Sequence, residues 1–427
     1  MGFQHGLSGL KAASTKLEVV GNNIANVNVV GFKQSQAQFS DVFANSLGGA
    51  SGSNHVGIGT RVSTIAQEFS QGNITMSNNP LDIAIAGKGF FRMNDNGAIS
   101  YTRNGQFQLD KDGFLVNADN INVTGYPANA NGQIITTAPA NLQLSTAELT
   151  PQATQNFGLG INLDSRTDVP APLPAFDATN PATYANSTSG AIYDSLGNSH
   201  TLTLYFQKTA PAQWGVFATV NGAVDGAGQP VGVTLDNGAG PLALTFDSNG
   251  ALTAPAGPID AEIDLGAVAA NLGIADWGAT SPLEFSFDLA SSTQFGSQFG
   301  VNRMSQDGFT SGRLAGFSVG DDGVIQGNYT NGVNRALGQI VLANFANPNG
   351  LRPLGRNQWV ETGESGLPLV GVPLSGTLGA LQSAAIEESN VDLTNELVSL
   401  ITAQRVYQAN AKTIQTQDTV LQTLVNI

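Results

Sequence analysis

Histidine is the side chain that most often serves acid–base chemistry or metal binding near neutral pH, and this 427-residue chain contains three. His5, His55 and His200 lie far apart, and none has a second histidine or a glutamate at the short spacing that builds a metal site. Cysteine is absent, which excludes disulfides and thiolate metal sites. The sequence therefore predicts neither a resident metal nor a cofactor.

Three short stretches resemble catalytic or binding motifs only in part. Asp194, Ser195 and His200 have the residue types of a hydrolase triad, but the serine lacks the glycines of a nucleophile elbow. Residues 110–113 have their glycine too early for a calcium loop, and residues 57–59 lack the third glycine of a phosphate-binding loop. We therefore expect that the protein is not an enzyme. A carbohydrate-active enzyme would need paired carboxylates in an aromatic groove, and the chain has only three tryptophans.

The charge balance limits the partners. The formal net charge is −15, from 32 acidic and 17 basic residues, so a nucleic-acid backbone would be repelled. No apolar run is long enough to cross a bilayer, and the first residues lack a basic region followed by a hydrophobic stretch. We expect no membrane insertion. The absence of cysteine suits an extracellular protein, which would be exported without a cleaved signal peptide.

Both ends of the chain carry apolar residues at heptad spacing, the pattern of a coiled-coil stripe. In residues 1–32 the stripe contains Leu10, Leu17, Val20, Ile24 and Val27. In residues 389–427 it contains Leu393, Leu397, Leu400, Tyr407, Ile414 and Leu421. We call these two sets the terminal seams and expect them to drive self-assembly.

The N-terminal seam lies in a segment rich in glycine and asparagine, so we expect it to form a stable helix only when its apolar side is buried. Residues 1–33 contain three lysines and one glutamate, whereas residues 386–427 contain two basic and five acidic residues. These opposite charges favour antiparallel or staggered pairing of the two ends.

Between the seams, short alternating strands are separated by Asn-Gly and Asp-Gly corners, which predicts a mainly β protein with helical, coiled-coil-like termini. We expect a discontinuous inner β-domain that carries an inserted outer β-domain. The expected segments are an N-terminal helix (1–32), a connector (33–70), the inner β-domain (71–150 with 290–365), the outer β-domain (151–289), a second connector (366–388) and a C-terminal helix (389–427).

Residues 21–33 read Gly-Asn-Asn-Ile-Ala-Asn-Val-Asn-Val-Val-Gly-Phe-Lys. This stretch resembles the N-terminal signature of bacterial flagellar axial proteins, the rod and hook family. The matching residues are Asn22, Asn23, Ala25, Asn26, Gly31, Phe32 and Lys33. Val29 departs from the pattern, since the family more often has threonine there. Residues 389–393 and 404–410 resemble the C-terminal signature, and the turn at residues 193–198 resembles one in the outer domain of hook members.

The resemblance implies a hook subunit rather than a rod subunit, because rod proteins generally lack an insertion as large as residues 151–287. It implies self-assembly into a flexible curved tube that transmits torque from the rod to the filament. It also implies export by the flagellar type III apparatus, growth beneath a hook cap, and contacts with the distal rod protein and a hook–filament junction protein. The alternatives are a distal rod protein of the same family and a β-rich surface adhesin or tail-like fibre.

Overall fold

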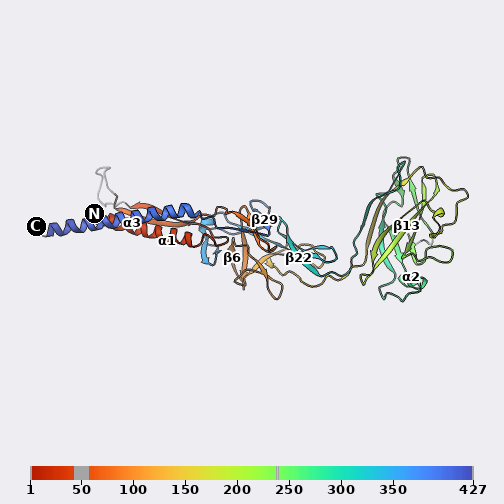
Figure 1. The fold of residues 1–427 in the computed structure, drawn as a ribbon, viewed down its shortest axis with the longest axis horizontal. Coiled ribbons are helices and arrows are strands. Elements are labelled where there is room, and N and C mark those ends of the chain that lie inside the picture. The colour runs from red at the N-terminus through yellow and green to blue at the C-terminus, as the bar shows by residue number, and fades with distance from the viewer. Residues whose placement is uncertain (1, 43–56, 237, 239, 426–427) are drawn as a thin grey trace. The chain divides into compact units, whose positions relative to one another are not determined.

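The computed structural model describes residues 2–42, 57–236, 238 and 240–425. Most of its regular structure is β-strand, and a long helix lies near each end of the chain (Figure 1). The described α-helices are α1 (Gly2–Ala25), α2 (Leu265–Leu272) and α3 (Leu393–Val425). The fold class predicted from the sequence is therefore confirmed.

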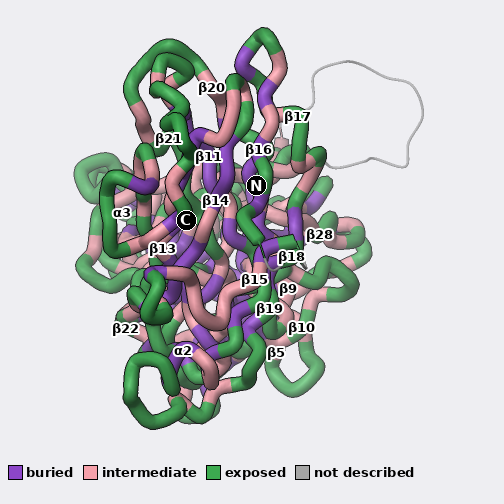
Figure 2. The backbone as a smooth tube through the Cα atoms, turned by 90° about the vertical axis from the view of Figure 1, so that its right-hand side faces the viewer, coloured by how far each residue is buried: buried purple, intermediate pink, exposed green. Residues whose placement is uncertain are grey.

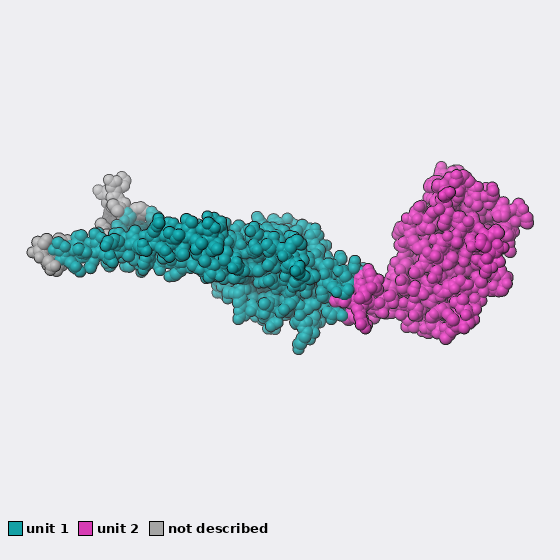
Figure 3. All heavy atoms as spheres, in the orientation of Figure 1, with its two compact units in different colours: residues 1–146, 315–328, 334–427 teal, residues 147–314, 329–333 magenta. Residues whose placement is uncertain are grey.

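The chain forms two compact units, one of which interrupts the sequence of the other (Figure 3). The first unit contains residues 1–146, 315–328 and 334–427, and thus both long helices. The inserted unit contains residues 147–314 and 329–333. We use these two names below.

The two long helices pack against each other in antiparallel directions within one chain. A β-carbon on Gly6 would lie 2.9 Å from Ile414 Cγ1, and one on Gly9 would lie 2.7 Å from Asn410 Oδ1. The absence of side chains at these two glycines therefore allows α3 to approach α1 closely. Ala13 of α1 is buried, as is Ala403 of α3. Contact with α3 of the same chain thus supplies part of the burial that the N-terminal seam needs.

The first unit also contains most of the short strands. They are β1 (Ser35–Val42), β2 (Gly59–Gln67), β3 (Ile74–Met76), β4 (Ile83–Ala86), β5 (Phe90–Asp95), β6 (Ala98–Thr102), β7 (Gln108–Leu109), β8 (Leu115–Val116), β9 (Asn122–Pro127), β10 (Ala140–Asn141), β22 (Leu314–Val319), β23 (Val324–Tyr329), β24 (Asn334–Ile340), β25 (Leu342–Asn344), β26 (Arg352–Gly355), β27 (Gln358–Val360), β28 (Leu369–Gly371), β29 (Ala380–Ser383) and β30 (Ala385–Glu387). Its largest sheet has the order β22-β23-β24-β9-β5-β6-β27-β26, which places strands from before and after the insertion side by side.

Both ranges that we expected to be connectors contain paired strands. Within residues 33–70, β1 and β2 form an antiparallel hairpin that lies along α1. Within residues 366–388, β28, β29 and β30 pair with β25, β4 and β3. The sequence predicted connectors because glycine and serine are typical of linkers. It could not show that β29 and β30 pair with strands about 300 residues earlier in the chain.

The inserted unit consists of two sheets with a common core. Its strands are β11 (Asn156–Asp164), β12 (Asn186–Tyr193), β13 (Ser199–Ala210), β14 (Gln213–Val220), β15 (Val233–Leu235), β16 (Leu242–Phe246), β17 (Leu252–Ala254), β18 (Ile259–Ile263), β19 (Leu283–Asp288), β20 (Thr293–Phe295) and β21 (Gly300–Gln306). One sheet has the order β12-β13-β14-β16-β17, and the other contains β11 with β15 and β18 to β21. Buried residues follow β11, β13 and β14 (Figure 2), and Trp214, Phe157 and Phe206 belong to the common core.

The inserted unit extends further along the chain than we expected. The sequence predicted that the inserted unit ends at residue 289. Strands β20 and β21 lie after that residue, and both pair with β11 of the inserted unit. Strand β21 follows β11 over residues 157–162 in antiparallel register. The sequence prediction missed β21 because this strand is polar and largely exposed on both faces, so it lacks the alternating apolar pattern of a buried strand.

The residues that resembled a hydrolase triad form a structural turn instead. His200 Nε2 lies 3.1 Å from Asp194 Oδ2, but the Ser195 hydroxyl accepts a hydrogen bond from the Thr280 N–H. The Thr201 N–H donates to Asn221 Oδ1, which leaves Asn221 Nδ2 to donate to His200 Nδ1. His200 Nδ1 therefore lies against the Asn221 amide, and Nε2 lies against the Asp194 carboxylate.

Aspartates in the turns of the inserted unit predict that acid destabilises it. Burial alone raises the pKa of Asp194, but hydrogen bonds from Asn198 and His200 outweigh burial, and the net pKa is lowered. The pKa of Asp307 is also lowered, because hydrogen bonds from Asn156 outweigh the effect of burial. A hydrogen bond from the Ala251 N–H lowers the pKa of Asp247. A carboxyl with a lowered pKa stabilises the fold above its ordinary value of 3.8, and that contribution is lost as the pH falls through the lower folded value.

We therefore expect the thermal midpoint of the inserted unit to fall between about pH 5 and about pH 2, measured by calorimetry on the full chain. Asp194→Asn is the matched variant. It should lower the midpoint at neutral pH and show a smaller further loss in acid. A midpoint that is independent of pH in both proteins would contradict the prediction.

Candidate self-assembly site

The structure divides the predicted terminal seams into a buried and an exposed part. On the N-terminal side, Val20 is buried and Leu10, Leu17 and Ile24 are half-buried, while Val27 lies in the turn after α1. On α3, Leu400 and Ile414 are half-buried. The other four α3 seam residues, Leu393, Leu397, Tyr407 and Leu421, are 37% to 54% exposed.

Ile414 of the predicted seam lies against Gly6 of α1, but a second row of α3 residues that approaches α1 was not predicted. Glu396 and Ala403 are buried and Asn410 is half-buried, and these three residues repeat every seven positions. The predicted stripe contains Leu397, one position later, in place of Glu396. The prediction selected large apolar residues, whereas a close approach to Gly6, Gly9 and Ala13 favours small or polar residues opposite them. The sequence did contain a signal for this contact: Gly6 and Ala13 of α1 are small residues seven positions apart, with Gly9 between them.

The consequence is an apolar face on α3 that has no partner within the described chain. It comprises Leu393, Leu397, Val398 and Ile401, which lie on one side of the helix. Val406, Tyr407, Val420 and Leu421 are also exposed, but they are spread round the rest of the helix circumference. The exposed fraction reaches 60% at Val398 and 50% at Ile401. Burial of each large apolar side chain is worth about 1.5–3 kcal/mol, so this face favours association.

Three signature residues hold the chain where it leaves α1. Asn23 Nδ2 donates to the Ser35 carbonyl at 2.8 Å, and the Ser35 N–H donates to Asn23 Oδ1 at 3.0 Å. Asn26 Nδ2 donates to the Asn22 carbonyl one turn earlier. Gly31 has a φ of +71°. Asn22 and Ala25 are exposed and Phe32 is half-buried.

Lys33, the last signature residue, is fully buried in an ionic cluster. Lys33 Nζ lies 2.7 Å from Glu387 Oε1 and donates to the Ser70 carbonyl at 2.6 Å. Arg103 Nη1 lies 3.2 Å from Glu387 Oε2, and Nη2 donates to the Gly87 carbonyl. Burial lowers the pKa of Lys33 and of Arg103, while Glu387 counteracts this effect on both. We call Lys33, Arg103 and Glu387 the junction cluster.

The junction cluster joins three parts of the first unit. Lys33 follows α1, Arg103 follows β6, and Glu387 ends β30 just before α3. Next to it, Asn390 Oδ1 accepts from the Gln34 N–H, and Asn390 Nδ2 donates to the Glu68 carbonyl. The sequence predicted Lys33 as a signature residue but missed both partners, which are 70 and 354 positions away.

These contacts position helices and do no covalent chemistry. In the described residues, no group of three or more histidine, cysteine or acidic side chains could hold a metal. Among the same residues, no helix combines the length and the apolar character that crossing a bilayer requires. The roles of the seam and signature residues in assembly stay predictions.

Comparison with family models covers most of the chain. Residues 3–33 match the flagella basal body rod protein family, and residues 84–164 match the flagellar hook protein FlgE/F/G D1 domain. Residues 162–309 match the flagellar basal body protein FlaE D2 domain and fall within the inserted unit. Residues 382–427 match the flagellar basal body rod FlgEFG protein C-terminal family.

Comparison with whole proteins gives matches over the full length. The chain is 39% identical to the flagellar hook protein FlgE of Escherichia coli and 38% identical to that of Salmonella typhimurium, with 100% of each chain covered. It is 32% identical to the FlgE of Borreliella burgdorferi over 99% of this chain and 98% of the relative.

A solved structure shares the fold. The crystal structure of the Helicobacter pylori flagellar hook protein FlgE2 matches with a TM-score of 0.52 at 17% identity, over 74% of this chain and 99% of that one. The full-length matches do not favour the distal rod protein or the adhesin as alternatives. The chain therefore belongs to the flagellar hook protein family and is a structural subunit of the hook of the bacterial flagellum.

Proposed function

We propose that this subunit polymerises through the exposed apolar face of α3, and that the paired helices α1 and α3 form the inner wall of a tube. The observation that carries the proposal is the row of large apolar side chains on α3, which α1 leaves uncovered. Small residues of α1 allow the close approach of α3, and the exposed apolar side of α3 is available to neighbouring copies.

The junction cluster fits this role because it fixes the helix pair to the β-structure of the first unit. Lys33 and Glu387 meet where α1 ends and α3 is about to begin. Load applied to the helices of a polymer would therefore pass into the β-strands through buried ionic contacts rather than through a flexible linker. This connection suits a subunit that transmits torque.

The remaining surface suits a tube that bends. Charged residues make up 11% of the chain, and small or polar residues are abundant. A weakly charged polar surface allows neighbouring copies to slide more easily than a large apolar interface does. Export by the flagellar type III apparatus, growth beneath a hook cap, and contacts with the distal rod protein and a hook–filament junction protein belong to the same proposal. Family membership and the absence of cysteine support them.

A double substitution on the exposed face tests the proposal. Leu397→Asp with Ile401→Asp should raise the critical concentration for polymerisation at least about a hundredfold, because two apolar contacts worth about 1.5–3 kcal/mol each are lost. Sedimentation and electron microscopy of the purified full chain measure this. Unfolding of the monomer should change by less than about 1 kcal/mol, since both side chains are exposed.

The matched control is Gln408→Glu with Gln415→Glu, which adds the same two negative charges at exposed polar positions of α3. This control should polymerise nearly as well as the parent chain. Equal loss of polymerisation in both double variants would show that charge, not the apolar face, decides assembly. Tubes from the Leu397→Asp/Ile401→Asp variant at the parent concentration would reject the proposal.

A further inference from the structure

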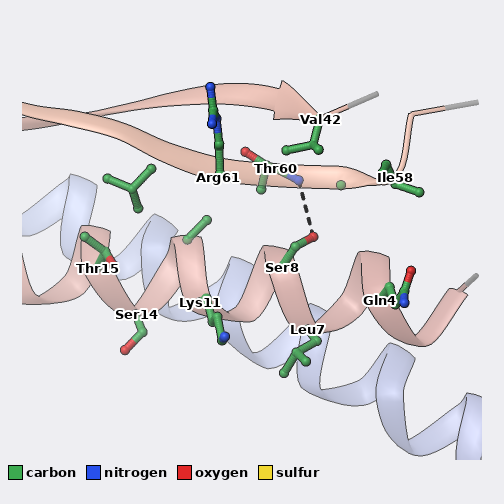
Figure 4. Close-up of a pocket in the computed structure, with 13 residues that line it drawn as sticks. Gln4, Leu7, Ser8, Lys11, Ser14, Thr15, Val42, Ile58, Thr60 and Arg61 are labelled. Carbon is green, nitrogen blue, oxygen red and sulfur yellow. Dashed lines mark hydrogen bonds between the residues drawn. The ribbon is translucent and has the colours of Figure 1, made fainter. Parts of the chain in front are cut away.

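A groove runs between α1 and the β1–β2 hairpin (Figure 4). It has a volume of about 640 Å³ and is lined by apolar residues that include Leu7, Val42 and Ile58. Lys11 of α1 and Arg61 of β2 are the charged residues of the described lining, and both are exposed. The Thr60 N–H donates to the Ser8 hydroxyl at 3.3 Å, which ties β2 to α1 at one side of the groove. The groove is thus largely apolar, and the charged ends of Lys11 and Arg61 point away from each other (Figure 4).

The last turns of α3 extend past α1. Gly6 lies against Ile414, and α1 begins at Gly2, so the antiparallel pairing ends near Gln417. All six residues from Asp418 to Thr423 are exposed, and Figure 1 shows α3 continuing beyond the N-terminal end of α1. We call residues 418–425 the overhang.

The overhang complements the groove. Val420 and Leu421 are 51% and 54% exposed and lack a partner in the described chain. Asp418 is the one ionisable side chain of the overhang, opposite in charge to Lys11 and Arg61. Because α3 is continuous to Val425, the overhang points away from the groove of its own chain and cannot fold back into it.

We propose that the overhang of one copy lies in the α1–β2 groove of a second copy. Val420 and Leu421 enter the apolar part, and Asp418 faces Lys11. The proposal rests on the polymerisation proposed above and names one of its contacts. Each copy offers one groove and one overhang on different surfaces, so the contact is head-to-tail and leaves a free site at both ends of any oligomer. Such a contact continues a filament rather than closing a dimer.

Site-specific crosslinking tests the contact, since the chain has no cysteine of its own. Thr15→Cys lies in the groove and Leu421→Cys lies in the overhang. Within one chain these positions are about 25 Å apart, at 1.5 Å per helical residue, so a disulfide between them joins two copies. Polymerised double variant treated with copper phenanthroline should give a ladder of covalent oligomers on a denaturing gel, and the unpolymerised variant should give none.

The matched control is Thr15→Cys with Gln133→Cys, because Gln133 is an exposed residue of the first unit outside the groove and the overhang. It should polymerise without a ladder. Fibres of the Thr15→Cys/Leu421→Cys variant without a ladder, or with one no stronger than the control, would overturn the groove contact while leaving polymerisation through α3 intact. Failure of the parent chain to polymerise would overturn both proposals.

A charge exchange provides a second measurement for the case in which the cysteine variant does not polymerise. Lys11→Glu should raise the critical concentration about two- to fivefold, the range of a surface ion pair. Adding Asp418→Lys should bring it back towards the parent value. A double variant that polymerises no better than Lys11→Glu alone would overturn the groove contact.

Discussion

Replacing Glu387 with alanine is expected to lower the free energy of unfolding of the first unit by about 3–5 kcal/mol. The substitution leaves Lys33 and Arg103 buried without their counter-charge, and both are nearly inaccessible to water. It also removes the acceptor of the Gly72 N–H. Urea unfolding of the full chain, followed by hydrogen exchange in peptides from β6 and β30, measures the effect.

Glu388→Ala is the control, because Glu388 is the next residue in the chain but is exposed. We expect a change within about 0.5 kcal/mol. Glu387→Gln should fall between the two, because the amide keeps one acceptor but loses the charge. If Glu387→Ala and Glu388→Ala were equally stable, the junction cluster would not hold the helix pair on the β-structure.

Gly31→Ala is the second substitution with a large expected effect. At its φ of +71°, a non-glycine residue costs about 1–2 kcal/mol. A β-carbon there would lie 2.6 Å from the Asn104 backbone nitrogen and 2.7 Å from the Arg103 carbonyl carbon. Because backbone must shift, overpacking adds about 1–3 kcal/mol, for a total loss of about 2–5 kcal/mol. Denaturant unfolding of the full chain measures it.

Gly21→Ala is the matched control within the same signature region. Gly21 lies in α1, has an ordinary helical φ, and has no atom within 4 Å of a β-carbon built on it. Alanine should therefore stabilise α1 by about 0.5–1 kcal/mol. A Gly31→Ala protein as stable as Gly21→Ala would show that the Gly31 conformation is not required for the chain to leave α1 beside Arg103.

The sequence by itself determined the features that depend on local spacing. Heptad repeats predicted the two terminal helices, and corner dipeptides predicted a mainly β interior. The pattern from Asn22 to Lys33 indicated the family that the full-length comparisons show. Periodicity and turn chemistry act within a few residues, so they can be read without knowing which segments meet.

Only the tertiary structure decided the features that depend on distant partners. Lys33 meets Glu387 across 354 positions, and β29 and β30 are strands because β4 and β3 pair with them. The exposed face of α3 also follows from the glycines of α1, which select Ala403 and Asn410 rather than Leu397 as the inner row. Close approach of two backbones depends on small residues on both, and a single helical pattern does not contain that information.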